Sequence, residues 1–432
     1  MALGWVMLCT MKRIERIRLY PTPHRAAALA RMLDVTRDLY NALLQQRRDS
    51  YRLRRISLTA RMQYAELTEL RGEDTRVRAT YRECEDAVLH RLDLAMRAFF
   101  RRVKRGEAPG FPRFKSRSRW TQLEFPHGDR ALRFDAEQRR VTIPGVGVVK
   151  LRKGRAVPTT YGRAWLLCKS DRWYACFECE RAVQPLPATD AVVGVDRGVH
   201  VLAALSDGRL IANAAVGERR KAASARLQRE LEAVTVRDGA GRVLNRRDPQ
   251  RQKAQARLGR AKEREANARR DYAHKVSRQI VNGADVIALE KLRLRAMTRS
   301  AKGSVERPGR HVRAKAGLNR RLLDSGFGLL RQMIVAKAEE AVRTVVEVDA
   351  RFSSQTCAHC GHVASESRRR RRYCCIACGY ATHADVNAAL VIRGRAQLAL
   401  MSESTRPRTP VAAIRMSRRR HTQRKASTRT RT

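Results

Sequence analysis

Apolar positions in the first part of the chain follow two periodicities. Residues 12–20 alternate apolar and basic side chains, as a half-buried strand does, and prolines end that strand. Between 24 and 107, apolar residues recur at helical spacing. From 108 to 187, short alternating runs are separated by Gly and Pro, and they predict a small β-barrel. We therefore expect a strand, then helices, then barrel strands.

A second domain is expected from about residue 188, where apolar strands end on acidic residues. Residues 190–196 finish on Asp196, and residues 284–290 repeat this design and finish on Glu290. The pattern predicts further strands at 199–205, 210–212 and 344–349. It also predicts two long basic helices, at 218–234 and 249–282. A helix is expected to follow Asp385. The order of elements indicates a mixed, α+β fold.

Two Cys-x-x-Cys-Gly knuckles near the C-terminus predict a metal site. Their spacing is typical of a structural zinc site, in which thiolates complete a tetrahedron, here with Cys357, Cys360, Cys375 and Cys378. The glycine after each pair permits the tight turn that directs both sulfurs at one ion. Cys374 offers a competing thiolate beside Cys375, so the ligand could be either. A further Cys-x-x-Cys, at 176–179, lies in an alternating run and is interpreted as strand.

The charge of the chain indicates its class of partner. Lys and Arg number 92 against 42 Asp and Glu, which leaves a net charge of +50 over 432 residues. Such charge opposes compaction unless a polyanion neutralises it, and the natural polyanion is nucleic acid. A membrane surface fits less well, because the basic residues run through the whole chain.

Location and assembly follow from weaker signals. No stretch reaches transmembrane length, and the first residues lack the basic leader of a secretory signal. The clustered cysteines suit a reducing compartment. We expect a cytoplasmic, nucleoid-associated bacterial protein with no membrane partner, and a monomer.

Three carboxylates form the candidate reactive centre: Asp196, Glu290 and Asp385 each stand at a strand end or a helix start. If their strands are neighbours, the ends converge, and the repelling carboxylates become favourable by binding hard cations such as Mg²⁺. Two such ions about 3.5–4 Å apart activate water and stabilise the leaving oxygen of a phosphodiester. Taken singly, each acid is as readily a helix cap or a surface charge, so the hypothesis rests on the combination.

Two segments carry candidate nucleic-acid contacts. The segment 110–116 interleaves aromatic and basic residues, which could stack on bases and hold phosphates, namely Phe111, Arg113, Phe114 and Lys115. A packed strand is the competing interpretation of this segment. An arginine run lies between the knuckles, and its place beside Asp385 favours phosphate contacts over a solvated face for Arg368, Arg369 and Arg370.

Several motifs occur in a fixed order between about residues 16 and 395. They are Arg18-Leu-Tyr-Pro21, Leu39-Tyr-Asn41, Gly110-Phe-Pro-Arg-Phe-Lys115, Gly194-Val-Asp-Arg-Gly198, Ile287-Ala-Leu-Glu-Lys-Leu292, Ser354-Gln-Thr-Cys-Ala-His-Cys-Gly361 and Asp385-Val-Asn-Ala-Ala389. Together they resemble the TnpB family, nucleases encoded by insertion sequences that are similar to compact type V CRISPR effectors. One departure is Arg197, which stands where the family often has an apolar residue.

The resemblance implies an architecture and a chemistry. It implies a RuvC-like, RNase H-type nuclease in which Asp196, Glu290 and Asp385 hold two catalytic Mg²⁺ ions, with an inserted zinc finger that holds one structural Zn²⁺. It also implies an N-terminal wedge β-barrel interrupted by recognition helices. The expected parts are an extension (1–11), the barrel (12–23 and 108–187), the helices (24–107), the nuclease (188–352 and 382–400), the finger (353–381) and a disordered basic tail (401–432).

The resemblance further implies partners and an activity. Family members use a guide RNA from their own locus and cut double-stranded DNA beside a short recognised motif, so base pairing supplies sequence specificity. A miniature type V CRISPR effector would share these features. An unguided transposase would share the carboxylates, yet the sequence shows no separate end-recognition module such as a helix-turn-helix. The intact carboxylates argue against a non-catalytic nucleic-acid-binding regulator.

Overall fold

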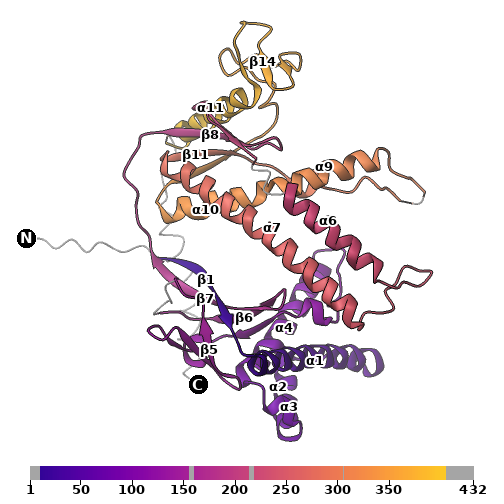
Figure 1. Cartoon of the computed structure of the whole chain (residues 1–432). Helices are drawn as coiled ribbons and strands as arrows, with labels where there is room; N and C mark the ends of the chain where they lie inside the picture. The colour runs from indigo at the N-terminus through magenta and orange to yellow at the C-terminus, as the bar shows by residue number, and fades with distance from the viewer. Residues whose placement is uncertain (1–9, 155–159, 214–217, 305, 405–432) are drawn as a thin grey trace, which may run out of the picture. The chain divides into compact units, whose positions relative to one another are not determined.

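The computed structural model describes residues 10–154, 160–213, 218–304 and 306–404 (Figure 1). Most of the expected N-terminal extension, and the expected disordered tail from residue 405 onward, lie outside the described residues. The chain forms two compact units, one from Met1–Val183 with Leu227–Arg260 and one from Gln184–Arg226 with Ala261–Thr432. Within the described ranges, none of the helices is long and apolar enough to cross a membrane.

The helices of the first unit are α1 (Pro23–Arg54), α2 (Ala60–Glu73), α3 (Thr75–Arg78) and α4 (Arg82–Lys104). Helix α1 begins where the sequence predicts, because the side chain of Thr22 accepts a hydrogen bond from the backbone N–H of Arg25 and Pro23 suits the first turn. Its apolar stripe joins the core that α4 and the neighbouring sheet complete. The predicted helical region is therefore confirmed as helix.

The first unit also contains a curled, antiparallel, seven-stranded sheet in the order β2-β6-β7-β1-β5-β4-β3. Its strands are β1 (Thr10–Tyr20), β2 (Gln122–Phe125), β3 (Arg133–Asp135), β4 (Arg140–Ile143), β5 (Gly147–Leu151), β6 (Ala164–Lys169) and β7 (Arg172–Ala182). Most of β1 pairs with β7, whereas its last residues also pair with β5. Strand β2 was not expected, because its four residues are too short a run to display alternation. A short helix, α5 (Gly128–Ala131), precedes β3.

The second unit is built on a mixed five-stranded sheet in the order β10-β9-β8-β11-β12. The predicted strands are present as β8 (Val192–Asp196), β9 (Val201–Leu205), β10 (Leu210–Ala212), β11 (Val286–Glu290) and β12 (Thr344–Val348). The first three form an antiparallel meander, and β11 runs parallel to both β8 and β12. Because Val195 lies opposite Leu289 in this register, Asp196 and Glu290 stand at the same edge of the sheet.

Helices cover both faces of this sheet. The remaining helices are α6 (Glu218–Ala233), α7 (Pro249–Asn282), α8 (Leu294–Met297), α9 (Val312–Ser325), α10 (Phe327–Glu340) and α11 (Ala384–Ser404). On one face, Val195 and Leu289 pack with apolar side chains of α7 and α10. On the other face, Ala288 packs with Ile392 and Ala396 of α11.

Strand alternation decides which face the two acids share. Successive side chains of a strand point to opposite faces, so Gly194 and Asp196 share one face of β8, and Ala288 and Glu290 share that same face of β11. This is the face that α11 covers. Asp385 lies in the first turn of α11, so all three acids lie on the α11 side of the sheet.

Gly194 permits α11 to lie directly on the sheet. A Cβ added at Gly194 would stand 2.0 Å from the carbonyl oxygen of Ala389 and 2.8 Å from the backbone nitrogen of Arg393. On the facing helix, Ala389 at this contact and its neighbour Ala388 are small and fully buried. The Asp-x-Asn-Ala-Ala motif and the Gly-Val-Asp motif are thus two halves of one close packing contact.

A small three-stranded sheet, β13-β14-β15, precedes α11. Its strands are β13 (Arg368–Arg369), β14 (Arg372–Cys374) and β15 (Ala381–His383). The buried side chain of Tyr373 packs with Cys357 and Cys375, so the core of this segment is the cysteine cluster itself.

Substituting Gly194 tests the close contact of α11 with the sheet. Gly194→Ala should destabilise the protein by about 1–3 kcal/mol, because backbone lies opposite the new methyl group and the helix must shift. Gly394→Ala on the same helix is the matched control, since a Cβ there meets nothing within 4 Å and alanine favours a helix. Thermal unfolding checks the pair, and equal midpoints for the two variants would contradict the packing argument.

Candidate functional site: carboxylates beside a four-cysteine cluster

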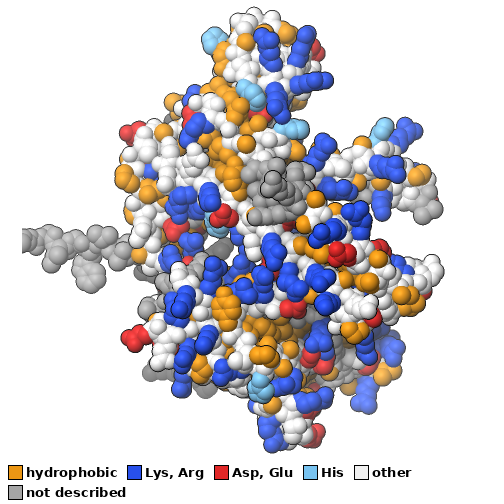
Figure 2. All heavy atoms as spheres, viewed as in Figure 1, with side chains coloured by type: hydrophobic (Ala, Val, Ile, Leu, Met, Phe, Trp, Pro, Cys, Tyr) orange, Lys and Arg blue, Asp and Glu red, His pale blue; other side chains and the backbone are white. Residues whose placement is uncertain are grey.

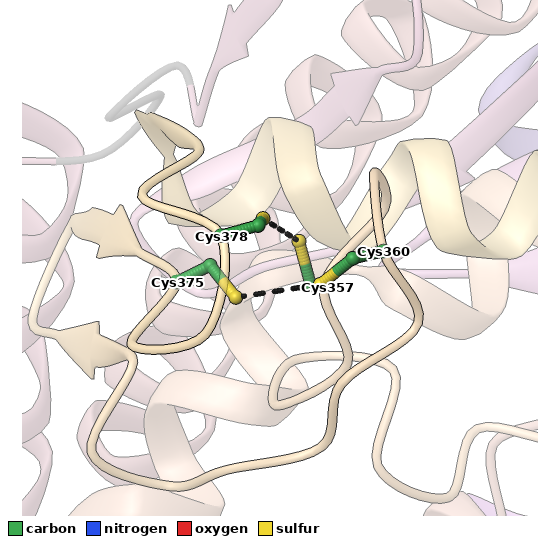
Figure 3. A group of neighbouring side chains, drawn as sticks. All are labelled: Cys357, Cys360, Cys375 and Cys378. Atoms are coloured by element: carbon green, nitrogen blue, oxygen red, sulfur yellow. Dashed lines mark hydrogen bonds between the residues drawn. The ribbon is translucent and has the colours of Figure 1, made fainter.

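The four predicted zinc ligands lie together. Within the described residues, they are the one group of three or more His, Cys, Asp or Glu whose ligand atoms all lie within 4.8 Å of one another. Figure 3 shows their side chains, from two loops, directed at one another. The Sγ atoms of Cys357 and Cys378 are 3.7 Å apart, and those of Cys360 and Cys375 are 3.6 Å apart. A zinc tetrahedron with Zn–S distances of about 2.3 Å has edges of roughly 3.8 Å, so the cluster fits one ion.

The backbone of each knuckle explains the spacing. Gly361 and Gly379 have φ of 76° and 72°, and their N–H groups donate to the carbonyls of Cys357 and Cys375. Glycine accommodates this left-handed conformation readily. The backbone N–H of Cys378 is the main cause that lowers the pKa of Cys375 to about 6, which favours its thiolate. Cys374 is exposed and lies outside the cluster, so Cys375 is the residue in the ligand position.

Asn387 connects the first knuckle to helix α11. Its side chain is fully buried; Nδ2 donates to the carbonyl of Thr356 at 2.7 Å, and Oδ1 accepts from the N–H of Ala358 at 3.0 Å. Both partners flank Cys357. Asparagine is unfavourable inside a helix. Its presence in a predicted helix was therefore the feature of the sequence that could have indicated a specific hydrogen-bond partner. The cysteine cluster therefore positions the helix on which Asp385 lies.

The candidate carboxylates affect one another strongly. Burial raises the pKa of Asp196 well above its usual range, and a hydrogen bond with Glu290, the charge of Glu290 and the charge of Asp385 raise it further. Glu290 is itself buried. The structure therefore brings Asp196, Glu290 and Asp385 into one electrostatic neighbourhood, from two adjacent strands and one helix.

Arg197 provides a buried positive charge beside the carboxylates. Its side chain is 4% exposed, and its guanidinium donates to the backbone carbonyl of Glu290 and, at 3.5 Å, to that of Phe327. Burial lowers the pKa of Arg197, while the charge of Glu290 opposes this effect. The sequence marked this residue as a departure from the family pattern but did not predict its place behind the strand end that carries Glu290.

The predicted phosphate-binding arginines occupy different environments. Arg369 and Arg370 are exposed. Arg368 instead points to the carboxylates, and its Nη2 donates to Oδ1 of Asp385 at 2.9 Å. The arginine run is therefore divided between solvent and the candidate site.

The aromatic and basic segment of the first unit is an irregular loop, so its interpretation as a packed strand is wrong. Phe111, Arg113 and Phe114 are exposed there. The side chain of Asn41, from the Leu-Tyr-Asn motif on α1, holds the loop by two hydrogen bonds to the backbone of Lys115, at 2.8 and 3.0 Å. Sequence reasoning missed this role of Asn41. The second Cys-x-x-Cys, Cys176 and Cys179, lies buried in β7, as interpreted.

A cysteine substitution tests the metal assignment. Cys378→Ser should lose the zinc and, because zinc binding in such sites contributes on the order of 10 kcal/mol to folding, should unfold the segment that holds Asp385. Cys374→Ser is the matched control and should keep one zinc per chain. Elemental analysis with thermal unfolding checks both variants. Full zinc in Cys378→Ser, or greater loss in Cys374→Ser, would overturn the ligand set.

Three families of known proteins match parts of the chain. Residues 174–301 match a family described as "Probable transposase", residues 327–392 one described as "Cas12f1-like, TNB domain", and residues 7–55 one described as "Helix-turn-helix domain". Over the described part of 7–55, the structure has strand β1 and the single long helix α1. These described residues therefore do not form two short helices joined by a turn.

Individual relatives extend these matches over most of the chain. It is 34% identical over 322 residues to "Putative RNA-guided DNA endonuclease InsQ" of Escherichia coli (strain K12), covering 73% of this chain and 76% of that protein. It is 29% identical over 404 residues to a "Putative RNA-guided DNA endonuclease" of Streptomyces pristinaespiralis, covering 89% of each.

A solved structure is also similar, although weakly. The chain aligns with the protein of a Cas12f1–sgRNA–target DNA complex at 14% identity, over 89% of this chain and 99% of that one, with a TM-score of 0.33. The identity to the Escherichia coli protein over about three quarters of its length, together with the matched families, is sufficient: the chain belongs to the TnpB family, the OrfB proteins of IS605-type insertion sequences.

Proposed function

We propose that this protein is an RNA-guided DNA endonuclease that hydrolyses phosphodiesters at Asp196, Glu290 and Asp385. The observation that carries the proposal is the position of these acids: Asp196 and Glu290 end adjacent strands, and Asp385 lies in the first turn of the helix that covers the same face. Glu290 is buried and Asp385 is 17% exposed, so the negative charge of these acids is partly withdrawn from water. Divalent cations are the ligands that satisfy it.

The residues present fit Mg²⁺ as the cofactor. Carboxylate oxygens are the ligands that Mg²⁺ prefers, and the raised pKa of Asp196 reflects burial and then repulsion from its neighbours, which a bound cation would relieve. Two bound Mg²⁺ ions would supply an activated water and stabilise the leaving oxygen. The chain's own contribution is to hold the carboxylates: Arg197 restrains the strand end at Glu290, and Asn387 restrains the helix of Asp385.

The architecture supports a nuclease of the RuvC-like, RNase H type. The three antiparallel strands followed by two parallel strands, with acids at the ends of β8 and β11, suit such a domain. We assign the nuclease to 188–352 and 382–400, the finger to 353–381 and the recognition helices to 24–107. The curled sheet of the first unit is then the wedge barrel, from 12–23 and 108–187.

Nucleic-acid partners are favoured by charge and by relatives. In Figure 2, Lys and Arg side chains are scattered over the visible surface, and Asp and Glu side chains are fewer. Such a surface binds phosphate backbones without reading sequence, and a guide RNA would supply the specificity. The descriptions of two relatives both begin with "Putative RNA-guided DNA endonuclease". In the first unit, exposed Phe111 and Phe114 with Arg113 and Lys115 suit a single strand or an unpaired base.

An unguided transposase is the second candidate. The matched family described as "Probable transposase" favours it. It requires recognition of the ends of an element, and the described part of 7–55 has no pair of short helices for that task. A type V CRISPR effector would use the same site and differ only in the source of its guide.

Neutralising single carboxylates tests the chemistry. Asp196→Asn, Glu290→Gln and Asp385→Asn should each lower Mg²⁺-dependent DNA cleavage by roughly 10³-fold or more, because metal stabilisation of the transition state is worth several kcal/mol. DNA binding should change little, since the basic surface is unaltered. Asp207→Asn, in the β9–β10 turn, is the control and should cut normally. A variant that retains cutting removes its residue from the site.

Isolation of the bound RNA tests guidance. Expressed with its flanking DNA, the protein should co-purify with one discrete RNA whose 3′ segment extends past the element boundary, because its net charge favours a structured polyanion. Replacing that 3′ segment should redirect cleavage to a new matching DNA. Sequencing of the bound RNA and cleavage of two DNA targets provide the measurement. Heterogeneous RNA, with cleavage that ignores its sequence, would favour the transposase instead.

A further inference from the structure

Arg368 differs from the rest of the arginine run because it lies against the carboxylates. Its Nη2 is 2.9 Å from Oδ1 of Asp385, and the two side chains are 31% and 17% exposed. The following residues, Arg369 to Arg372, are exposed. A charge-assisted hydrogen bond at this distance in a partly dehydrated place is stronger than a surface ion pair.

The backbone of Arg368 is held by the second knuckle. Arg368 lies opposite the buried Tyr373 in the β13–β14 pair. The preceding residue, Ser367, is buried; its carbonyl accepts from the N–H of Cys374 at 2.8 Å, and its Oγ accepts from the N–H of Ile376 at 3.3 Å. Because the cysteine cluster fixes these residues, the guanidinium is delivered to Asp385 by folded structure and not by a mobile loop.

The charge of Arg368 reaches beyond Asp385. Asp385, to which Arg368 is bound, lies on the α11 side of the sheet that Asp196 and Glu290 share. Arg368 therefore offsets part of the negative charge of the whole cluster. Among the described residues, these carboxylates are not a group whose ligand atoms all lie within 4.8 Å. Asp385 is bonded to Arg368 in an arrangement more open than a single-ion site.

We propose that Arg368 is a latch on the metal site: it occupies Asp385 before the ions and the DNA bind. A cation that takes Oδ1 of Asp385 as a ligand must displace the guanidinium, so Arg368 competes with the metal. A DNA phosphate at the site offers the displaced guanidinium a bidentate partner. The inference rests on the proposed function, because it takes the carboxylates to be metal ligands.

The latch couples two binding events. A ligand that occupies Arg368 frees Asp385, so DNA raises the affinity for the metal and the metal raises the affinity for DNA by the same factor. Without a target strand, the site binds divalent cations weakly. Stray cleavage of DNA that is not correctly placed is then suppressed by the protein itself.

Binding of Mn²⁺ tests the latch without using activity. The probe is free Mn²⁺ measured by electron paramagnetic resonance, with the full chain and the RNA that it carries. The signal is the bound Mn²⁺ that is lost in the Asp385→Asn variant. Because the RNA holds the same ions in both proteins, its contribution is subtracted. Arg368→Gln should bind this Mn²⁺ about tenfold more tightly than the natural protein, within the usual range of coupling. Arg372→Gln, an exposed neighbour, is the matched control and should bind as the natural protein does.

Target DNA provides the second arm. A target duplex with N3′→P5′ phosphoramidate linkages at the cut positions, which keep both phosphate oxygens and resist cutting, should tighten Mn²⁺ binding of the natural protein by a similar factor, and that of Arg368→Gln much less. Unchanged or weaker Mn²⁺ binding in Arg368→Gln would overturn the latch. The zinc content of each variant shows whether it folds. If Arg368→Gln loses zinc, Arg368→Met, which keeps the apolar stem, replaces it in the experiment, and the same outcomes decide.

The two proposals fail in distinguishable ways. If Asp385→Asn abolishes cutting and Mn²⁺ binding while Arg368→Gln behaves as the natural protein, the nuclease site stands and the latch is wrong. If Asp385→Asn changes neither property, the carboxylate site itself is wrong, and the latch fails with it.

Discussion

The close contact between helix α11 and strand β8 is the constraint on which the candidate site depends. At Gly194 the backbone of the strand and the backbone of the helix are so near that a methyl group would stand 2.0 Å from the carbonyl of Ala389. Glycine on the strand and alanines on the helix make this approach possible. Asp196 lies two residues beyond Gly194, and Asp385 lies one turn before Ala389. The contact that packs α11 on the sheet therefore also brings these acids together.

The cysteine cluster extends this constraint instead of adding a separate module. Asn387 joins the first knuckle to α11, and Ser367 joins the second knuckle to Arg368. The same metal would thus position an acid and the cation that faces it. Loss of zinc is then expected to displace the candidate carboxylates, because the cluster holds the segments on which Asp385 and Arg368 lie.

The sign of the predominant charge differs between the surface and the candidate site. The exposed face carries Lys and Arg in excess, which suits a phosphate backbone. At the sheet edge, the protein instead gathers acids, of which Glu290 is buried, and compensates them with two specific cations, Arg197 from behind the strands and Arg368 from the finger. Charges withdrawn from water are costly unless they are paired. Removing either arginine would therefore leave acidic charge uncompensated.

The sequence alone determined the features that are local. Strand periodicity, the acids at the ends of two strands, the small residues of the Asp-x-Asn-Ala-Ala motif and the cysteine spacing are all readable from neighbouring residues, because backbone geometry fixes them within a few positions. The tertiary structure decided what depends on register and packing. The pairing of Val195 with Leu289 sets the acids side by side, and the choice of Cys375 over Cys374 follows from the turn. The burial of Arg197 and the pairing of Arg368 with Asp385 were not readable, because an arginine in a basic sequence looks alike whether it meets solvent, phosphate or a carboxylate. Only folding brings together partners that lie far apart along the chain, and only then does one arginine differ from the next.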